Sequence, residues 1–302
     1  MLIEEECIPC ILNMTLNGLN ATLKEKRGYR YVFHEIVKRV MGHEEIWNFT
    51  SAEIVEKALD LICELTSITD PFYTLKRETN SKLMRYYSTL CEILDSESDP
   101  VFLAFKLAII GNVIDTMVQT DYGGIVQDLV LKSKRLQVNE KKYETLIQKI
   151  SIANKILYIG DNSAEAILDM AFIEVLKRNY SLDVTYVVRN EPVLNDVTID
   201  DAIEIGLNRI ATVITNGIKG PLPGVILKRC SEEFLRHFDG SDLVIVKGGG
   251  NVETLSEELS LNERVFFLLM CKCRVHERFF QVSLGEAVIW NGPFPDSQAP
   301  TR

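Results

Sequence analysis

The chain has 302 residues, of which 46% are hydrophobic, so it has enough apolar material for one large domain or two ordinary ones. It carries 33 lysines and arginines against 43 aspartates and glutamates, which gives a formal net charge of −10. A chain this acidic repels the phosphate backbone of nucleic acids unless it has a local basic run, and the sequence shows none. We therefore expect no nucleic-acid partner.

Membrane insertion and export are not expected either. No apolar stretch reaches the length of about 18 residues that a spanning helix needs, and the first residues are acidic where a signal peptide is basic. Seven cysteines are too few, and too odd in number, for a disulfide scaffold. We expect a cytoplasmic protein in a reducing compartment, where clustered cysteines indicate metal or redox chemistry.

The first half of the chain has the periodicity of helices. Apolar residues recur there at helical spacing, and Thr50 with Glu53 fits a capping box at the start of one helix. Pro71 and Pro100 interrupt the pattern, because proline disfavours helical backbone at the residue before it. The predicted helices cover residues 4–24, 30–41, 52–68, 80–93, 99–118 and 139–151.

The pattern changes near residue 152, where short β-rich runs begin to alternate with helical segments. Apolar strands separated by helices indicate a parallel sheet that is covered on both faces. We therefore predict a helical N-terminal domain over residues 1–152 and an α/β domain over residues 153–302. The predicted strands cover residues 156–159, 184–188, 211–215, 243–246, 265–270 and 287–290.

Polar residues follow the predicted strands. In an open parallel sheet, ligands bind in the crevice beyond the carboxyl ends of the strands, so these residues are expected to share one edge. They form the segments 160–165, 189–198, 216–217 and 247–253. Carboxylates, amides and one lysine thus converge on the predicted binding edge.

The turn after the first predicted strand does not fit a dinucleotide-binding loop. It lacks the G-x-G-x-x-G pattern, and Asp161 would face a pyrophosphate directly. With a cation the contact becomes favourable, because Asp161, Asn162 and Asp196 offer hard oxygen ligands that suit Mg²⁺ or Mn²⁺ and also serve Co²⁺ or Ni²⁺. The alternative is that these residues only cap helices and form turns.

Lys247 is followed directly by three glycines. Glycines let backbone N–H groups approach an anion, the next helix presents its positive end, and the lysine adds a full charge. The segment therefore favours an anion site, although its residue order is not that of a P-loop. A plain turn with a solvated lysine is the alternative.

Together these motifs resemble the damage-control phosphatase family, also called the metal-binding, protein-glutamate-methyltransferase-like family. The resemblance covers nearly the whole chain, and the cysteines resemble those of its Cys-bearing subfamily. Ala164 stands where the family usually has glycine, and Gly249 where a larger polar residue is common. The matching segments are 7–10, 111–115, 160–165 with Asp169, 189–201, 216–217, 223–224, 247–253 and 270–273.

The resemblance implies an α/β/α sandwich with a mostly parallel, Rossmann-like sheet and a helical N-terminal part. It implies that Asp161, Asn162 and Asp196 hold a divalent metal. It also assigns Glu165 to substrate contact, and Lys247 with the glycine-rich turn to phosphate. The substrate-binding set that we predict is Glu165, Asn112, Arg189, Gly248 and Asn251.

The physical chemistry of phosphate transfer agrees with these assignments. A divalent ion neutralises phosphate charge and can activate a water molecule, while Lys247 would stabilise the transferring phosphoryl group. Activated water is the favoured nucleophile, and direct attack by Asp161 is the alternative. We predict a phosphoric monoester hydrolase that acts on small phosphorylated metabolites, such as sugar phosphates or nucleotide-related phosphates.

Two other functions stay open. A carboxyl methyltransferase that uses S-adenosylmethionine is claimed within the family, but the glycine-rich loop expected after the first strand is missing. A non-catalytic metal-binding protein would use the C-x-x-C pair Cys7 and Cys10, completed by Cys271, Cys273 and His276. The alternative is that these cysteines pack as small apolar residues.

The predicted helix over 99–118 carries two polar residues on an apolar background. Asn112 and Asp115 lie three residues apart and so share a face of that helix. We predict that Asn112 contacts substrate, with an interhelical hydrogen bond as the alternative. Cys63, Cys91 and Cys230 lie in helical patterns and are expected to be packing residues.

Overall fold

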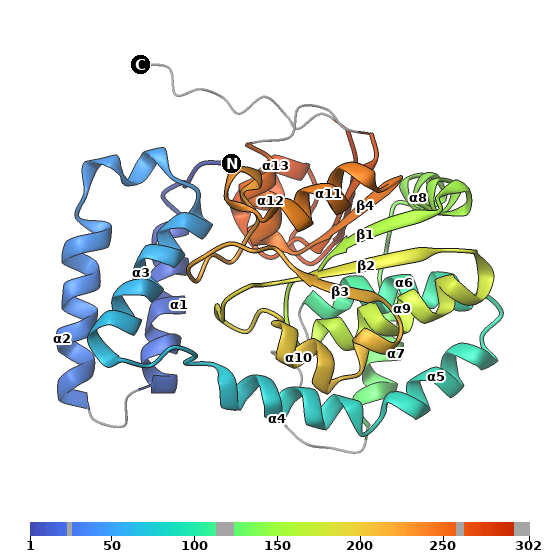
Figure 1. Ribbon diagram of the computed structural model, residues 1–302, viewed down its shortest axis with the longest axis horizontal. Helices are drawn as coiled ribbons and strands as arrows, with labels where there is room; N and C mark the ends of the chain where they lie inside the picture. The colour runs from blue at the N-terminus through green and yellow to red at the C-terminus, as the bar shows by residue number, and fades with distance from the viewer. Residues whose placement is uncertain (23–25, 113–123, 258–262, 293–302) are drawn as a thin grey trace.

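The computed structural model describes residues 1–22, 26–112, 124–257 and 263–292 of the chain (Figure 1). Three N-terminal helices pack together at one end of the molecule, with a π-helical segment η1 (Val37–Met41) and a 3-10 segment η2 (Glu44–Asn48) between the second and third. Buried side chains such as Ile11, Leu19 and Ile62 form their core. The helices are α1 (Cys7–Thr22), α2 (Lys26–Ile36) and α3 (Ser51–Thr66).

The predicted capping box at Thr50 is confirmed. The Thr50 side chain accepts a hydrogen bond from the backbone N–H of Glu53 at 3.3 Å, and the Glu53 carboxylate accepts one from the Thr50 backbone at 2.8 Å. The pair satisfies two N–H groups that would otherwise lack partners at the start of α3. It thereby fixes the first turn of α3.

Within the described residues, five more helices precede the sheet. The predicted helix over 80–93 is wrong in its bounds, because the chain turns at Tyr86 and forms two helices there. Another helix, over 125–135, was not predicted. Residues 113–118 of the predicted helix 99–118 lie outside the described part of the chain. The five helices are α4 (Tyr73–Met84), α5 (Tyr87–Ser96), α6 (Pro100–Ile110), α7 (Ile125–Arg135) and α8 (Glu140–Ile152).

The second half forms a six-stranded sheet in the order β3-β2-β1-β4-β5-β6. Every neighbouring pair is parallel except β5 and β6, which are antiparallel. The predicted strands and the mostly parallel, Rossmann-like α/β class are confirmed. The strands are β1 (Lys155–Ile159), β2 (Asp183–Val188), β3 (Thr212–Thr215), β4 (Leu243–Lys247), β5 (Val265–Met270) and β6 (Ala287–Trp290).

Helices cover both faces of the sheet, as Figure 1 shows, with α6, α7 and α9 on one face and α11, α12 and α13 on the other. The helical spacing of residues 226–237 predicts one helix there, whereas the structure forms the 3-10 turn η5 (Leu227–Arg229) and then α11. Short helical turns complete this half: α10 (Ile199–Glu204) and η4 (Leu207–Arg209). The covering helices are α9 (Glu165–Asn179), α11 (Glu232–Gly240), α12 (Gly249–Leu255) and α13 (Arg274–Phe280).

Alternating side chains of the strands divide the interior into two cores. Tyr158, Tyr186 and Ile245 point into the core under α6 and α9, whereas Leu157 and Val246 point into the core under α11 and α12. Residues of α4 to α8 belong to the first of these cores, so this part of the helical half packs on the sheet itself. The domain division at residue 152 stays a prediction.

No helix within the described ranges is both long enough and apolar enough to cross a membrane.

Candidate functional site

A cavity of about 410 Å³ lies at the carboxyl edge of the sheet. Its walls come from the loops after β1, β2 and β5, the start of α12, and from α1 and α3 of the N-terminal helices. The strands β1 and β4 are neighbours, and the chain continues from β1 toward one edge of the sheet and from β4 toward the other. Open α/β sheets bind ligands at such a topological switch point. This cavity is the candidate active site.

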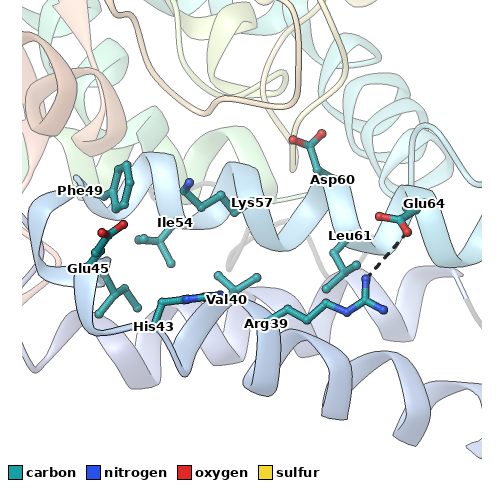
Figure 2. Close-up of a pocket in the computed structure, with 11 residues that line it drawn as sticks. Arg39, Val40, His43, Glu45, Phe49, Ile54, Lys57, Asp60, Leu61 and Glu64 are labelled. Atoms are coloured by element: carbon teal, nitrogen blue, oxygen red, sulfur yellow. Dashed lines mark ion pairs between the residues drawn. The ribbon is translucent and has the colours of Figure 1, made fainter.

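A cavity of about 460 Å³ between η1 and α3 is a weaker candidate (Figure 2). Every residue that lines it lies between Arg39 and Glu64, so no strand end contributes to it. Arg39 is paired with Glu35 at 2.7 Å and with Glu64 at 3.9 Å, and half of its side chain is exposed. The charge of Arg39 is therefore matched by carboxylates of the N-terminal helices.

Backbone hydrogen bonds join the loops after β1 and β2. The N–H of Val197 donates to the carbonyl of Asp161, and the N–H of Ser163 donates to the carbonyl of Asn195, both at 2.8 Å. A β-bridge pairs Asn162 with Asp196. These contacts bring the side chains of Asp161, Asn162 and Asp196 to the same wall of the cavity.

A buried amide supports this pair of loops from behind. The side chain of Asn80, on α4, donates a hydrogen bond of 2.9 Å to the hydroxyl of Ser163. Both residues are almost fully buried. Asn80 had no sequence signal that separates it from any other helical asparagine, and it ties the helical half to the turn that carries Asp161.

Arg189 lies directly behind the acidic wall and does not line the cavity. Its Nε is 2.7 Å from an Asp196 oxygen and its Nη2 is 3.6 Å from an Asp161 oxygen. Its Nη1 donates to the carbonyl of Gly224 and to the side chain of Asn251. The structure therefore places Arg189, predicted to bind substrate, as a buried partner of the two carboxylates instead.

Burial and charge both act on these carboxylates. Burial raises the pKa of Asp161 well above its ordinary value, and the nearby charges of Asp196 and Glu165 raise it further, against the opposing charge of Arg189. Burial also raises the pKa of Asp196, although Arg189 counteracts it. A divalent cation between two such carboxylates would relieve their repulsion, so the residues present fit a hard metal ion.

Asn112 lines the cavity just beyond the end of α6, and its contact with substrate stays a prediction. Its side-chain nitrogen donates hydrogen bonds to Asp161 Oδ2 at 3.0 Å and to Glu165 Oε2 at 3.2 Å. Glu165 itself is fully buried and does not line the cavity, so the structure places it behind the wall and not against a substrate. Asp115, the other predicted polar residue, lies outside the described part of the chain.

The predicted phosphate-binding residue Lys247 is also behind the wall. Its side chain is fully buried, and its ammonium lies 2.6 Å from both Glu165 Oε1 and Asp169 Oδ1 and 2.9 Å from the carbonyl of Ala108. Two of its three donors make hydrogen bonds to Asp169 and Ala108, and Glu165 is its ion-pair partner. The buried ammonium is thus matched by groups of the protein and does not line the cavity.

Gly248 and Asn251 have structural partners as well. Gly248 adopts a φ of 79°, and a Cβ there would lie 2.0 Å from an Asp161 oxygen, so glycine is required for the carboxylate to fit. Asn251 donates to the carbonyls of Gly160 and Lys247. Neither residue lines the cavity, in contrast to their predicted contact with substrate.

Lys272 is a cavity residue that our sequence analysis missed. It follows β5, lines the cavity, is exposed, and donates a hydrogen bond to the backbone carbonyl of Asn112. A lysine two residues beyond a predicted strand is a candidate for the binding edge by the same reasoning as Lys247.

Cysteines form another part of the cavity lining. Cys7 and Cys10 come from the first turn of α1, and Cys273 and His276 from the start of α13. Cys271 instead points into the core under α11 and α12, so it does not take part. Among the described residues, no three His, Cys, Asp or Glu side chains are placed to hold a metal ion together. A second metal site at Cys7, Cys10 and Cys273 stays a prediction.

The thiols of this part of the lining differ in acidity. Burial raises the pKa of Cys7 to about 11 and also raises the pKa of Cys10. Burial acts in the same direction on Cys273, but hydrogen bonding to His276 and its charge outweigh it, so the pKa of Cys273 is lowered. Cys273 is therefore the most readily ionised thiol of the cavity.

The small residue Gly249 has a visible consequence. A Cβ at this position would lie 2.7 Å from the His276 ring, so glycine admits the imidazole against the start of α12. His276 is thereby placed 3.4 Å from the Glu253 carboxylate. Glycine at position 249 thus leaves room for His276 in the lining of the cavity.

Fold and site together define an α/β protein with a mostly parallel sheet and an acidic cavity beside the β1–β4 switch point. A family model described as the damage-control phosphatase ARMT1-like domain matches residues 3–288. The chain belongs to this family. Membership implies a divalent metal cofactor and supports a metal-dependent phosphatase.

Several relatives are similar over much of their length. An uncharacterised protein of Methanocaldococcus jannaschii is 31% identical, with 95% of this chain and 94% of that protein covered. A damage-control phosphatase of Pyrococcus horikoshii is 36% identical over 74% of this chain and 76% of its own length. A crystal structure of a DUF89 family protein from the same organism superposes with a TM-score of 0.84, at 28% identity, over 96% of this chain and 99% of that one.

Proposed function

We propose that this protein hydrolyses phosphate monoesters of small metabolites, such as sugar phosphates or nucleotide-related phosphates, with a divalent metal ion held by Asp161, Asn162 and Asp196. The observation that carries the proposal is the convergence of these three side chains on one wall of a 410 Å³ cavity. Their oxygens are the ligands that Mg²⁺ and Mn²⁺ prefer. When bound, such an ion supplies charge neutralisation and an activated water.

Lys272 is the residue that we assign to the phosphate group. It is exposed on the cavity wall and is held near the acidic residues through its hydrogen bond to the Asn112 carbonyl. A cation at this position would stabilise the negative charge of a transferring phosphoryl group. This role replaces the one that the sequence suggested for Lys247.

The rest of the cavity favours a small substrate. Apolar side chains from α1 and α3, with Phe72 and Leu194, also line the cavity. A volume of about 410 Å³ suits a ligand of metabolite size. The net charge of −10 disfavours polyanions but not a single phosphate that is matched by Lys272 and a metal ion.

Hydrolysis of p-nitrophenyl phosphate with Mg²⁺, Mn²⁺, Co²⁺ or Ni²⁺ tests the proposal. We expect metal-dependent release of phosphate that Asp161→Ala and Asp196→Ala each reduce by at least about 100-fold. Asp239→Ala, on the exposed side of α11, is the matched control and should keep full activity. No release with any metal, or equal rates for wild type and Asp161→Ala, would contradict the proposal. A phosphometabolite panel under the best metal then identifies the substrate.

A further inference from the structure

Asn112 and Asn162 direct their side-chain amides at the same two carboxylate oxygens. The Asn162 nitrogen donates to Asp161 Oδ2 at 3.0 Å and to Glu165 Oε2 at 2.9 Å. The Asn112 nitrogen donates to the same two atoms, at 3.0 and 3.2 Å. Each amide nitrogen has two N–H donors, and both are used in this ring of four side chains.

The ring determines which way each amide faces. If either amide were turned over, its oxygen would meet two carboxylate oxygens, and the contact would be repulsive. Both asparagines line the cavity, so their amide oxygens are the atoms that remain for a ligand there. An amide oxygen is a good ligand for a hard cation or for a water molecule bound to one.

Glu165 can act as an acceptor for both amides because it is paired with Lys247. The Lys247 ammonium lies 2.6 Å from Glu165 Oε1, and both side chains are fully buried. The two oxygens of this carboxyl group thus have separate partners, the ammonium at Oε1 and the two amides at Oε2. The ion pair therefore fixes the orientation of the carboxyl group that both amides use as an acceptor.

Lys247 also fixes the approach of α6. Its ammonium donates to the carbonyl of Ala108, in the last turn of the helix that precedes Asn112. A Cβ at Gly111 would lie 3.0 Å from the Glu165 side chain, so glycine allows this close packing. The same lysine therefore orients Glu165 and holds the segment that carries Asn112.

We propose that Glu165 and Lys247 are positioning residues that hold the amide oxygens of Asn112 and Asn162 toward the bound cation, so that Asn112 supplies a further oxygen ligand to the ion or to its water. This inference rests on the proposed metal-dependent function. It assigns the helical half a direct part in metal binding, through one side chain at the end of α6. It also explains why two fully buried residues belong to the motifs of the site.

Calorimetric titration of the metal-free protein with MnCl₂, without substrate, tests the inference. We expect Glu165→Gln to weaken Mn²⁺ binding by about 10- to 100-fold, the range typical of residues that orient metal ligands. Asn112→Ala should weaken it by about tenfold. The control is Tyr186→Phe, which removes a 2.9 Å hydrogen bond to Asp169 on the far side of Lys247 and should keep the wild-type Kd within about twofold.

The outcomes separate the inference from the function on which it rests. If wild type binds no Mn²⁺, the proposed function fails. If wild type binds Mn²⁺ and folded Glu165→Gln binds it equally well, the positioning role is overturned while the function stands. Equal weakening in all three variants would also overturn it, because the effect would then be general loss of structure. If Glu165→Gln does not fold, Asn112→Ala compared with Tyr186→Phe decides the question.

Discussion

The ammonium of Lys247 lies 2.6 Å from Glu165 Oε1, and neither side chain is exposed to solvent. This pair belongs to a larger set of buried charges around the acidic wall, in which four carboxylates face two cations. The set is Asp161, Glu165, Asp169 and Asp196 with Arg189 and Lys247. With every group ionised, two negative charges are in excess, which one divalent ion would balance. The buried charges thus form an environment that favours a metal ion over a neutral ligand.

Metal removal should destabilise the protein. An ion present at about 100 times its Kd contributes about 2.7 kcal/mol, which in a chain of this size corresponds to a rise in Tm of roughly 5 °C. We expect thermal unfolding to show this rise on addition of Mn²⁺ and its reversal by EDTA. The variant Asp161→Asn/Asp196→Asn should not respond. A response of equal size in that variant would place the ion elsewhere.

Lys272→Ala should impair catalysis more than folding. Its side chain is exposed on the cavity wall and hydrogen bonds to a backbone carbonyl, so its removal should leave the Tm within about 2 °C of wild type. Loss of one cation from a phosphate site should lower kcat/KM for a phosphate ester by about 10²-fold. Lys141→Ala, on the exposed face of α8, is the control. Unchanged kinetics in Lys272→Ala would remove this lysine from the site.

Gly248→Ala should displace the Asp161 carboxylate. The new Cβ would lie 2.0 Å from Asp161 Oδ2, on a backbone with φ of 79°. Gly285→Ala is the matched control, since its φ is 84° but no atom lies within 4 Å of the added Cβ. Both variants carry backbone strain of about 1 kcal/mol, and only Gly248→Ala should lose metal-dependent phosphatase activity. Equal activity loss in both would mean that backbone strain, not the carboxylate, is responsible.

The strands and the acidic wall could both be predicted from the sequence, because both follow from the pattern of a buried parallel sheet. Buried parallel strands are continuous apolar runs, and their carboxyl ends meet at one edge, so the polar residues that follow β1 and β2 had to converge. Helix bounds were less certain. The helix over 125–135 has apolar residues at helical spacing, Ile125, Val126, Leu129 and Val130, and it could have been found.

The roles of the two lysines could not be separated without the direction of each side chain. Lys247 is the last residue of β4, where Val246 points to one core and Lys247 therefore to the other, beneath α6 and α9. Lys272 lies two residues beyond the end of β5, where the pleat no longer determines its direction. Lys247 is buried because it still belongs to its strand, and Lys272 is not because its strand ends before it.

Thiol reactivity in the cavity should follow acidity and not exposure. Cys10 is a more exposed residue than Cys273. The pKa of the Cys10 thiol is nevertheless raised, by partial burial and by the charge of Glu253. The pKa of Cys273 is lowered, because its contact with His276 outweighs burial. The pKa of His276 is itself raised to about 10, because its contacts with Cys273 and Glu253 outweigh burial, so it stays protonated near neutral pH.

Since the thiolate is the reactive form, Cys273 should reach its maximal alkylation rate at a lower pH than Cys10. At pH 7 we expect iodoacetamide to modify Cys273 several-fold faster, as measured by mass spectrometry of the labelled peptides. His276→Ala should slow Cys273 and shift its rate profile to higher pH, while the profile of Cys10 moves little. Preferential labelling of Cys10 at pH 7 would show that exposure governs reactivity in this cavity and that the contact between His276 and Cys273 does not ionise the thiol.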